Sequence, residues 1–297
     1  MILDDVDARS GSATSLLRTI VGVGLRRLGG WISVAELIRL MNAVGVSAPH
    51  TRTAISRVKA KGLLLPETRQ AAAGYALNPE AVPMLESGDR RIFTFRQMAD
   101  GDQWCLLSFS IPETQRGVRH LLRQRLGWIG CGTVSTGLWI CPAFLTDEVE
   151  QIVTELHLGE QVTIFLTDTP RTAHSLAEAA RRWWDLERLA GLHRNFLESQ
   201  RGIPTGGVDP HDTDRHGTDP HDTEPHGTDL QDAGGSFRRF IRALDQWRIL
   251  PYLDPGLPPA ALPDNWPGFD SLALFEQITV QHRAAAHEFF HAGPAVG

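Results

Sequence analysis

The fold of the N-terminal region is decided by one stretch, SVAELIRLMNAVGVSAPHTRTAISRVKAKGLL, at residues 33–64. Ser33 is followed three residues later by Glu36, a capping-box pattern that begins a helix. Apolar residues then recur at helical spacing until Gly45, where the helix ends. A second helix starts at Ser47 or at the proline two residues later, because both residue types favour the start of a helix. The stretch therefore predicts two helices joined by a tight turn.

The second helix, over residues 48–61, has two chemically different faces. At about 100° per residue, one face gathers the side chains that we expect to be buried: Thr51, Ala54, Ile55 and Val58. The other face carries arginines and short hydroxyl side chains. Arg pairs with guanine O6 and N7, and Ser or Thr reaches phosphates or base edges. We therefore predict that this helix reads the DNA major groove, with contacts from Ser47, His50, Arg52, Thr53, Ser56, Arg57, Lys59 and Lys61.

A further helix and a short hairpin flank this stretch. Apolar residues at helical spacing predict an amphipathic helix over 16–28, which Gly29-Gly30 ends. After the second helix, Leu63–Leu65 and Tyr75–Leu77 predict two short strands. The series of helix, capped helix, turn, basic helix and hairpin is typical of a winged helix-turn-helix domain, which we place at residues 12–86.

The wing of this domain is expected in the loop over 66–74, between the two strands. Arg69 and Gln70 lie at its centre, and we predict that they contact the DNA backbone or the minor groove. A winged helix can instead bind another protein, and this alternative stays open.

The charge distribution agrees with a DNA-binding N-terminal region, although the whole chain has a net charge of −6. Residues 209–232 carry eight acidic residues and one arginine, so this tract has a charge of −7 and the rest of the chain +1. Residues 1–99 carry 13 Arg or Lys and 8 Asp or Glu, an excess of +5. A basic excess beside the reading helix is what phosphate neutralisation requires.

The acidic tract is also a repeat. DPHDTDRHGT at 209–218 and DPHDTEPHGT at 219–228 agree at eight of ten positions. Having almost no apolar side chain, the tract cannot bury enough surface to offset the entropy lost on ordering. We therefore predict a disordered insertion over 202–235. A plain surface tract and weak binding of a divalent metal are both compatible with its regularly spaced histidines, His211, His216, His221 and His226.

Residues 100–168 show the βαββαβ pattern of a ferredoxin-like domain. The expected strands are Trp104–Ser110, Gly130–Thr136, Leu138–Cys141 and Gln161–Thr167, and the expected helices are Pro112–Leu126 and Thr146–Leu158. Residues 171–291 are helical apart from the insertion and a proline-rich link at 251–267. The fold class is therefore α+β, with a winged helix-turn-helix domain, a central ferredoxin-like domain and a mainly helical C-terminal domain.

Three separated blocks of the chain resemble the PaaX family, bacterial repressors of phenylacetic acid catabolism. They stand in the family's order. They are TRTAISRVKAKGLL (51–64) with the Tyr-x-Leu strand at 75–77, then WCLLSFSIPETQRGVRHLLRQRLGWIGCGTVSTGLWICP (104–142), then RRWWDLERLA (181–190) and FRRFIRALDQWRILPYLDPGLPPAALPDNWPG (237–268). The resemblance covers most of the chain except residues 1–11 and the insertion.

The resemblance implies a cytoplasmic homodimer that represses an aromatic or acyl catabolic pathway from an inverted-repeat operator in double-stranded DNA. It also implies release from DNA by an aryl- or acyl-CoA thioester, such as phenylacetyl-CoA. A solvated helix face, interdomain salt bridges or an ordinary helical core are the other roles open to the candidate ligand contacts. Those candidates are Arg116, Arg119, Arg123, Trp184, Arg239, Arg242 and Trp247.

No catalytic residue, cofactor or metal site is predicted. The central region looks like the small nuclease-like subunit of CRISPR adaptation systems, but Phe109, Ser110 and Ile111 stand where those proteins carry an acidic metal ligand. The chain also lacks a G-x-S-x-G motif, a P-loop, a dinucleotide fingerprint and an H-E-x-x-H motif. The alternatives are a CoA-ester-acting enzyme with an accessory winged helix and a metal-responsive regulator that uses the insertion.

The spacing of the cysteines and the hydropathy of the chain indicate the cellular compartment in which the protein is expected. Cys105, Cys131 and Cys141 form no C-x-x-C pair, which favours packed thiols in a reducing cytoplasm. No run of 18 or more apolar residues occurs, and the acidic N-terminus does not read as a secretion signal. We therefore expect a cytoplasmic protein without a membrane span.

Overall fold

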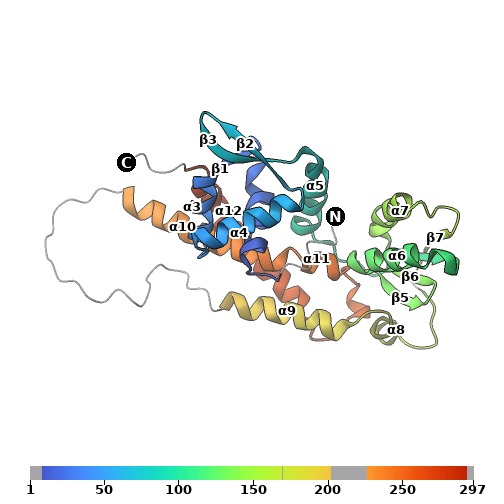
Figure 1. Ribbon diagram of the computed structural model, residues 1–297. Coiled ribbons are helices and arrows are strands. Elements are labelled where there is room, and N and C mark those ends of the chain that lie inside the picture. The colour runs from blue at the N-terminus through green and yellow to red at the C-terminus, as the bar shows by residue number, and fades with distance from the viewer. Residues whose placement is uncertain (1–8, 169, 202–225, 293–297) are drawn as a thin grey trace. The chain divides into compact units, whose positions relative to one another are not determined.

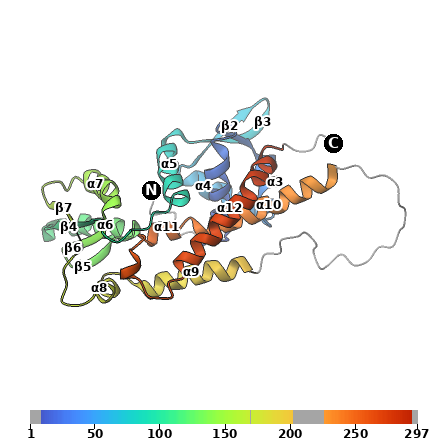
Figure 2. The ribbon, with the colours of Figure 1, turned by 180° about the vertical axis from the view of Figure 1, so that it is seen from behind.

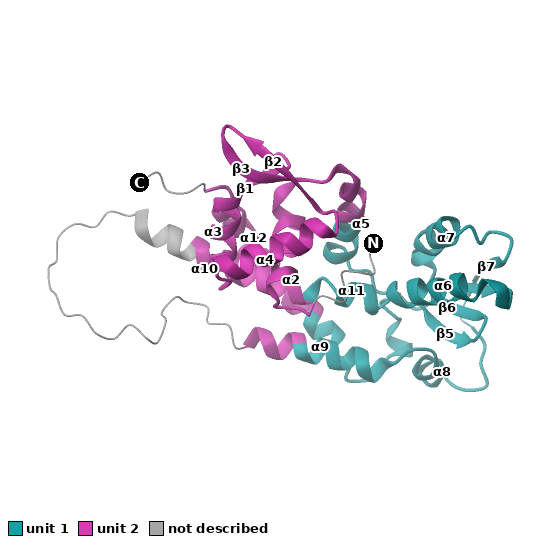
Figure 3. Cartoon of the chain, viewed as in Figure 1, with its two compact units in different colours: residues 1–6, 87–195, 247–271 teal, residues 7–86, 196–246, 272–297 magenta. Residues whose placement is uncertain are grey.

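The computed structural model describes residues 9–168, 170–201 and 226–292. The chain divides into two compact units, which Figure 3 draws in different colours. Unit 1 contains residues 87–195 and 247–271, and unit 2 contains residues 9–86, 196–201, 226–246 and 272–292. The boundaries between the units fall within four helices: α5 (Val82–Phe93), α9 (Leu186–Arg201), α10 (His226–Trp247) and α12 (Gly268–His291).

Unit 2 begins with three helices. They are α2 (Ala13–Ile20), α3 (Val34–Ala43) and α4 (Ala48–Ala60). Ser33 caps α3, since its hydroxyl accepts a hydrogen bond of 3.1 Å from the Glu36 backbone N–H. The reciprocal half of the predicted capping box is replaced, because the Glu36 carboxylate instead binds Arg39 on the next turn of the helix.

The first helix differs from the prediction of one amphipathic helix over 16–28. After Ile20 it continues as a π-helical turn, η1 (Val21–Leu25). This turn has the sequence VGVGL, and the Phe290 ring occupies the space that a side chain at Gly24 would need. A glycine-rich turn can therefore widen and admit the ring, which an ordinary α-helical turn with side chains could not.

The sheet of unit 2 has three antiparallel strands in the order β1-β3-β2. The strands are β1 (Trp31–Ser33), β2 (Leu64–Arg69) and β3 (Ala72–Leu77). The predicted wing loop over 66–74 is wrong in its extent, because the β2–β3 ladder runs from Leu64↔Leu77 to Arg69↔Ala72. Only Gln70 and Ala71 form the turn, with φ of 48° and 64°. Such a two-residue turn matches the twist of the flanking strands, and the hairpin projects from the helices in Figures 1 and 2.

Helices α10 and α12 complete unit 2. The ring of Phe237 lies 5.0 Å from the ring of Phe289 and 6.1 Å from that of Phe290. Helix α10 begins at His226, so the predicted disordered insertion over 202–235 extends too far. The last part of the predicted insertion contains Ala233, which is buried and lies one helical turn before Phe237 on the apolar face of α10. Residues 202–225, with most of the histidine repeat, lie outside the described residues.

Unit 1 contains the predicted βαββαβ domain. Its antiparallel sheet has the order β5-β6-β4-β7, which is the strand order of the ferredoxin-like arrangement. The strands are β4 (Trp104–Phe109), β5 (Gly132–Ser135), β6 (Leu138–Pro142) and β7 (Val162–Thr167). One core joins the sheet to α6 (Arg116–Trp128) and α7 (Thr146–Glu155), with Leu107, Leu122 and Val149 at its centre. The mixed α+β class and the central domain are as predicted.

A second core of unit 1 gathers tryptophans. It joins Trp104 of β4 to α8 (Leu176–Trp183), to the start of α9 and to the 3-10 turn η5 (Pro259–Ala261). The ring of Trp184 lies 6.2 Å from that of Trp104 and its indole N–H donates to the Gly130 carbonyl at 2.8 Å. The tryptophans therefore form a packed core between helices and the sheet. The short α11 (Leu250–Leu253) lies at the start of the predicted proline-rich link.

The three cysteines of the chain lie together in the first core. Cys105 stands opposite Cys141 in the β4–β6 ladder, and both are buried with Cys131. A hydrogen bond with Cys141 and burial raise the pKa of Cys105 far above its ordinary value. A hydrogen bond with Cys105 lowers the pKa of Cys141, but a hydrogen bond with Cys131 and burial together raise it well above its ordinary value. The raised pKa values keep the thiols of Cys105 and Cys141 protonated, and all three cysteines are packing groups of this core.

In the described part of the chain, no helix combines the length and apolar character needed to cross a bilayer.

Candidate nucleic-acid interface

Helix α4 has the two faces that its spacing predicts. Thr51, Ala54, Ile55 and Val58 are its buried residues. Thr51 is accommodated in the core because its hydroxyl donates a hydrogen bond of 3.0 Å to the Ser47 carbonyl. The helix is therefore held by one side, and the opposite side faces solvent.

All ten predicted DNA contacts are exposed. On α4 and its flanks they are Ser47, His50, Arg52, Thr53, Ser56, Arg57, Lys59 and Lys61. In the hairpin they are Arg69, the last residue of β2, and Gln70 of the turn. The structure thus brings the first eight to one helix and its ends, while the other two stand at the tip of the β2–β3 hairpin. Their joint exposure is the geometry that a nucleic-acid contact needs.

Three side chains on the outer face of α4 have unused hydrogen-bonding capacity. Among the described residues, Arg52, Ser56 and Arg57 have no hydrogen-bond or ion-pair partner. Thr53 differs, since its hydroxyl donates to the Pro49 carbonyl at 3.2 Å. The Ser47 hydroxyl bonds Nδ1 of His50 at 2.8 Å and does not cap the helix. The outer face of α4 therefore presents two free guanidinium groups to solvent.

Two aromatic residues support the basic side chains of the hairpin region. The guanidinium of Arg69 lies 5.6 Å from the centre of the Trp31 ring and also pairs with Glu67 at 2.5 Å. The ammonium of Lys59 lies 5.6 Å from the centre of the Tyr75 ring. Sequence analysis missed both aromatic supports. Trp31 belongs to β1, a strand of three residues that is too short to give an alternating pattern in the sequence.

Trp31 also determines the hairpin geometry. Its indole N–H donates to the Glu67 carbonyl at 3.2 Å, and β1 pairs with β3 through Trp31↔Ala76 and Ser33↔Gly74. A side chain at Gly74 would collide with the Trp31 ring and with the Ile32 carbonyl. The exposed hairpin is thus attached to the helices through β1.

The predicted ligand contacts of α6 are engaged within their own domain. Arg119 pairs with Glu113 at 2.6 Å, and Arg123 donates to the Thr136 carbonyl at 2.6 Å. Arg116 is exposed and shares no described contact with them. These contacts agree with the alternative of local salt bridges on a solvated helix face.

The predicted ligand contacts of the C-terminal region are spread over both units. Arg239 donates to the Gln200 carbonyl at 2.9 Å, and its burial lowers the pKa of the guanidinium. Arg242 donates to the Val44 carbonyl at 2.9 Å. Trp247 is buried and donates to the Ile92 carbonyl, and Trp184 lies in the tryptophan core. Each of these four residues is thus engaged in packing or hydrogen bonds within its own unit.

A serine, a histidine and an aspartate of unit 1 are hydrogen-bonded in series. His193 Nδ1 lies 2.5 Å from Ser271 Oγ, and His193 Nε2 lies 2.9 Å from Asp254 Oδ2. All three side chains are buried, and the Ser271 hydroxyl also donates to the Gly268 carbonyl. Because the serine is enclosed, a substrate cannot reach it, and the series acts as an internal tie. Among the described residues, no group of His, Cys, Asp and Glu could hold a metal ion.

Comparisons with known proteins match the chain in three consecutive parts. Residues 12–81 match the family description "PaaX-like protein", residues 97–179 match "PaaX protein central Cas2-like domain", and residues 184–292 match "PaaX-like protein C-terminal domain". The three matches together cover most of the chain, in the order that the family has. The chain belongs to the PaaX family.

Two individual proteins are similar to this chain. The transcriptional repressor PaaX of Escherichia coli (strain K12) is 24% identical over 201 residues. That match covers 67% of this chain but only 63% of the relative's own length. The solved structure of the uncharacterized protein Rv0674 from Mycobacterium tuberculosis has a TM-score of 0.55 at 19% identity, and the match covers 91% of this chain and 96% of that one. At this identity the second likeness concerns the fold alone.

Proposed function

We propose that this protein is a transcriptional repressor and that residues 12–86 form a winged helix-turn-helix domain. The observation that carries the proposal is α4, which is buried on one face and presents Arg52 and Arg57 without described partners on the other. A helix of this kind fits the major groove, where Arg reads guanine and short hydroxyl side chains reach phosphates. The order of α2, α3, α4 and the β2–β3 hairpin supports the same proposal.

The hairpin acts as the wing. Arg69 at its tip is held between Glu67 and the Trp31 ring, so it keeps its position at the surface. A charge held in this way contacts the phosphate backbone beside the groove that α4 enters, and contributes affinity without reading sequence. The outer face of α4 is polar and cationic, which favours DNA over the alternative of a protein partner.

We further propose that the repressor is a homodimer joined through the edge strand β7. This strand has the sequence VTIFLT, with no charge and no proline, and pairs with β4 on one side. Phe165 and Leu166 are 53% and 56% exposed. Natural edge strands usually carry charges, prolines or bulges that prevent further pairing. Two copies of β7 can pair antiparallel without charge repulsion, and a two-fold dimer suits an inverted-repeat operator.

The effector and the pathway follow from the family resemblance. We propose that an aryl- or acyl-CoA thioester, such as phenylacetyl-CoA, releases the repressor from its operator in the cytoplasm. The ligand must bind more tightly to a conformation that binds DNA poorly, and DNA must then weaken ligand binding by the same factor.

A gel-shift assay with DNA from the region upstream of this protein's own gene tests the proposal. We expect a retarded band that persists with unrelated competitor DNA and is lost when phenylacetyl-CoA is added. The absence of any band at low salt would reject DNA binding. A band that no CoA ester removes would reject the proposed effector and leave the DNA-binding function standing.

A further inference from the structure

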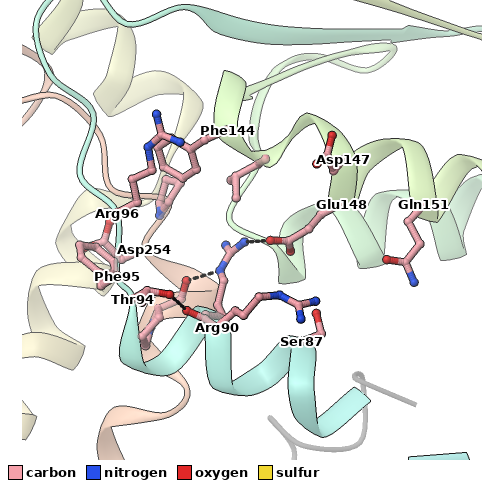
Figure 4. Close-up of a pocket in the computed structure, with 14 residues that line it drawn as sticks. Ser87, Arg90, Thr94, Phe95, Arg96, Phe144, Asp147, Glu148, Gln151 and Asp254 are labelled. Atoms are coloured by element: carbon pink, nitrogen blue, oxygen red, sulfur yellow. Dashed lines mark hydrogen bonds and ion pairs between the residues drawn. The ribbon is translucent and has the colours of Figure 1, made fainter. Parts of the chain in front are cut away.

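A cavity of about 460 Å³ lies within unit 1. Its walls come from the last turns of α5, the segment that follows α5, the start of α7 and residues 251–255 (Figure 4). Phe95, Phe144, Leu145, Pro251 and Pro255 supply its apolar surface. Cavities of this size are typical of small-molecule sites, which combine an apolar lining with a few polar groups.

One arginine of the cavity holds the walls together. Arg91 pairs with Glu148 of α7 at 2.6 Å and donates to the Pro251 carbonyl at 2.8 Å and the Ile129 carbonyl at 2.7 Å. Each guanidinium nitrogen of Arg91 has a partner, and Glu148 balances its charge. Arg91 therefore fixes the cavity walls in place and is not available to bind a ligand.

Two other arginines of the cavity carry charges that no acidic residue in the described part of the chain pairs with. Arg90 and Arg96 are exposed and have no ion-pair partner among the described residues. The guanidinium of Arg96 lies 4.8 Å from the centre of the ring of Phe144, another residue that lines the cavity. A guanidinium beside an aromatic ring is a common arrangement for binding a planar group that carries negative charge.

The acidic residues of the lining do not cancel this charge. Glu148 is paired with Arg91. Asp254 is buried, bonded to His193, and accepts a hydrogen bond from the Gly256 N–H. Only Asp147 is exposed, and it lies in the first turn of α7, where the helix dipole stabilises its charge. The open part of the cavity therefore has an excess of positive charge.

We propose that this cavity is the effector site and that it binds an organic anion bearing a planar apolar group. Arg96 pairs with the carboxylate or phosphate, and the planar group packs against Phe95 and Phe144. Arg90, whose side chain lies beside Ser87 and away from Arg96 in Figure 4, adds a second positive charge to the cavity. The inference rests on the proposed function. It also connects the ligand to the DNA-binding part of the chain. Arg90 belongs to α5, and α5 follows the wing strand β3 along the chain after the short 3-10 turn η2 (Pro79–Ala81).

Calorimetric titration of the full-length protein with three probes tests the proposal: phenylacetyl-CoA, phenylacetate and CoA. The variant Arg90→Gln/Arg96→Gln keeps polar side chains at two exposed positions, so its fold is preserved. We expect it to weaken binding of the best probe at least about tenfold, because charge-assisted bidentate hydrogen bonds are lost. Arg116→Gln, an exposed arginine of α6 outside the cavity, is the matched control and should bind as the unsubstituted protein does.

The three probes separate the sources of the negative charge. Binding of phenylacetate alone identifies a carboxylate site, and binding of CoA alone identifies a phosphate site, while a requirement for phenylacetyl-CoA indicates both parts. Equal binding by the double variant and the control would overturn the proposal, as would the absence of binding by all three probes. A gel shift without ligand accompanies each titration, so that loss of DNA binding is recognised as a failure of the proposed function itself.

Discussion

The hydroxyl of Ser15 donates a hydrogen bond of 2.6 Å to Asp245 Oδ1, although 230 residues separate the two along the chain. Thr19 donates to the same oxygen at 2.8 Å, and the Gly11 backbone N–H donates to Oδ2 at 2.7 Å. Asp245 is fully buried, so these donors replace the water that its carboxylate loses on folding. The aspartate thereby attaches α10 to α2 within unit 2.

Replacement of Asp245 by alanine is expected to destabilise the protein by about 3 kcal/mol, because buried donors lose their acceptor. The variant Asp245→Asn retains one acceptor oxygen and should lose less. Chemical denaturation followed by circular dichroism measures both. An unchanged denaturation midpoint for Asp245→Ala would show that the carboxylate does not contribute to stability.

Single replacement of Arg52 or Arg57 by alanine is expected to weaken operator binding by about 1–3 kcal/mol, as loss of a bidentate base contact does. Both side chains are exposed, so the denaturation midpoint should not change. Fluorescence anisotropy with labelled operator measures the affinity, and Arg116→Ala serves as the control. Unchanged affinity in both variants would mean that another face or helix reads the DNA.

The wing arginine should behave differently from the helix arginines. Arg69→Ala is expected to weaken operator and unrelated DNA to the same extent, and to reduce the salt dependence of binding by about one unit of slope. Trp31→Ala, which removes the ring beside Arg69, should act in the same direction. Loss of affinity for the operator alone would indicate that the wing reads base sequence.

The edge strand β7 permits a direct test of the dimer. Leu166→Lys places a charge on the exposed edge and should convert a dimer into monomers in analytical ultracentrifugation. Val280→Lys is the control, since Val280 is an exposed apolar residue of α12 with 83% of its surface accessible. If Leu166→Lys remains as dimeric as the control, the dimer uses another surface.

His287 links the stability of unit 2 to pH. Burial, and then the positive charges of Arg27, Arg283 and His291, lower the pKa of His287. Nη1 of Arg27 donates to its Nε2 at 3.0 Å, which requires the neutral imidazole. The unfolded chain therefore takes up a proton near the ordinary pKa of 6.5, whereas the folded protein does so only at lower pH.

Folding stability should consequently fall as the pH drops below about 6.5 and stop falling once the lowered pKa is passed. The variant His287→Gln cannot take up this proton, so it should lose less stability than the unsubstituted protein between about pH 7 and 5. Thermal unfolding at a series of pH values measures the difference. Parallel pH profiles for the two proteins would contradict the assignment.

Local patterns predicted the elements whose signals lie within a few residues. The spacing of Thr51, Ala54, Ile55 and Val58 predicted the buried face of α4, and Ser33 predicted the start of α3. The wing was predicted too long a loop, because Gln70 and Ala71 carry no glycine or asparagine signal for a turn with positive φ. Helix α5 was not predicted, because its apolar residues stand at its two ends and are separated by the polar run ESGDRR, so no helical repeat of apolar positions is visible.

Contacts between distant segments left no signal in the sequence. Nothing near Asp245 indicates that it binds α2, and nothing near Gly24 indicates that the Phe290 ring covers it. The cavity that contains Arg90 and Arg96 is likewise made by three parts of the chain. Periodicity reports which face of an element is buried, but it does not report which other element covers that face.

Unit 2 is assembled from both ends of the chain, and this limits how far its DNA-reading part is modular. A fragment that stops after β3 would contain every predicted DNA contact, yet Ser15 and Thr19 would lose their acceptor and Gly24 would lose the ring that covers it. Exchanging the DNA-reading N-terminal segments of two family members by a single crossover would therefore combine an N-terminal segment from one protein with α10 and α12 from the other. The contacts between these segments would then no longer match. A functional chimaera would need the N-terminal segment, α10 and the second half of α12 from the same parent.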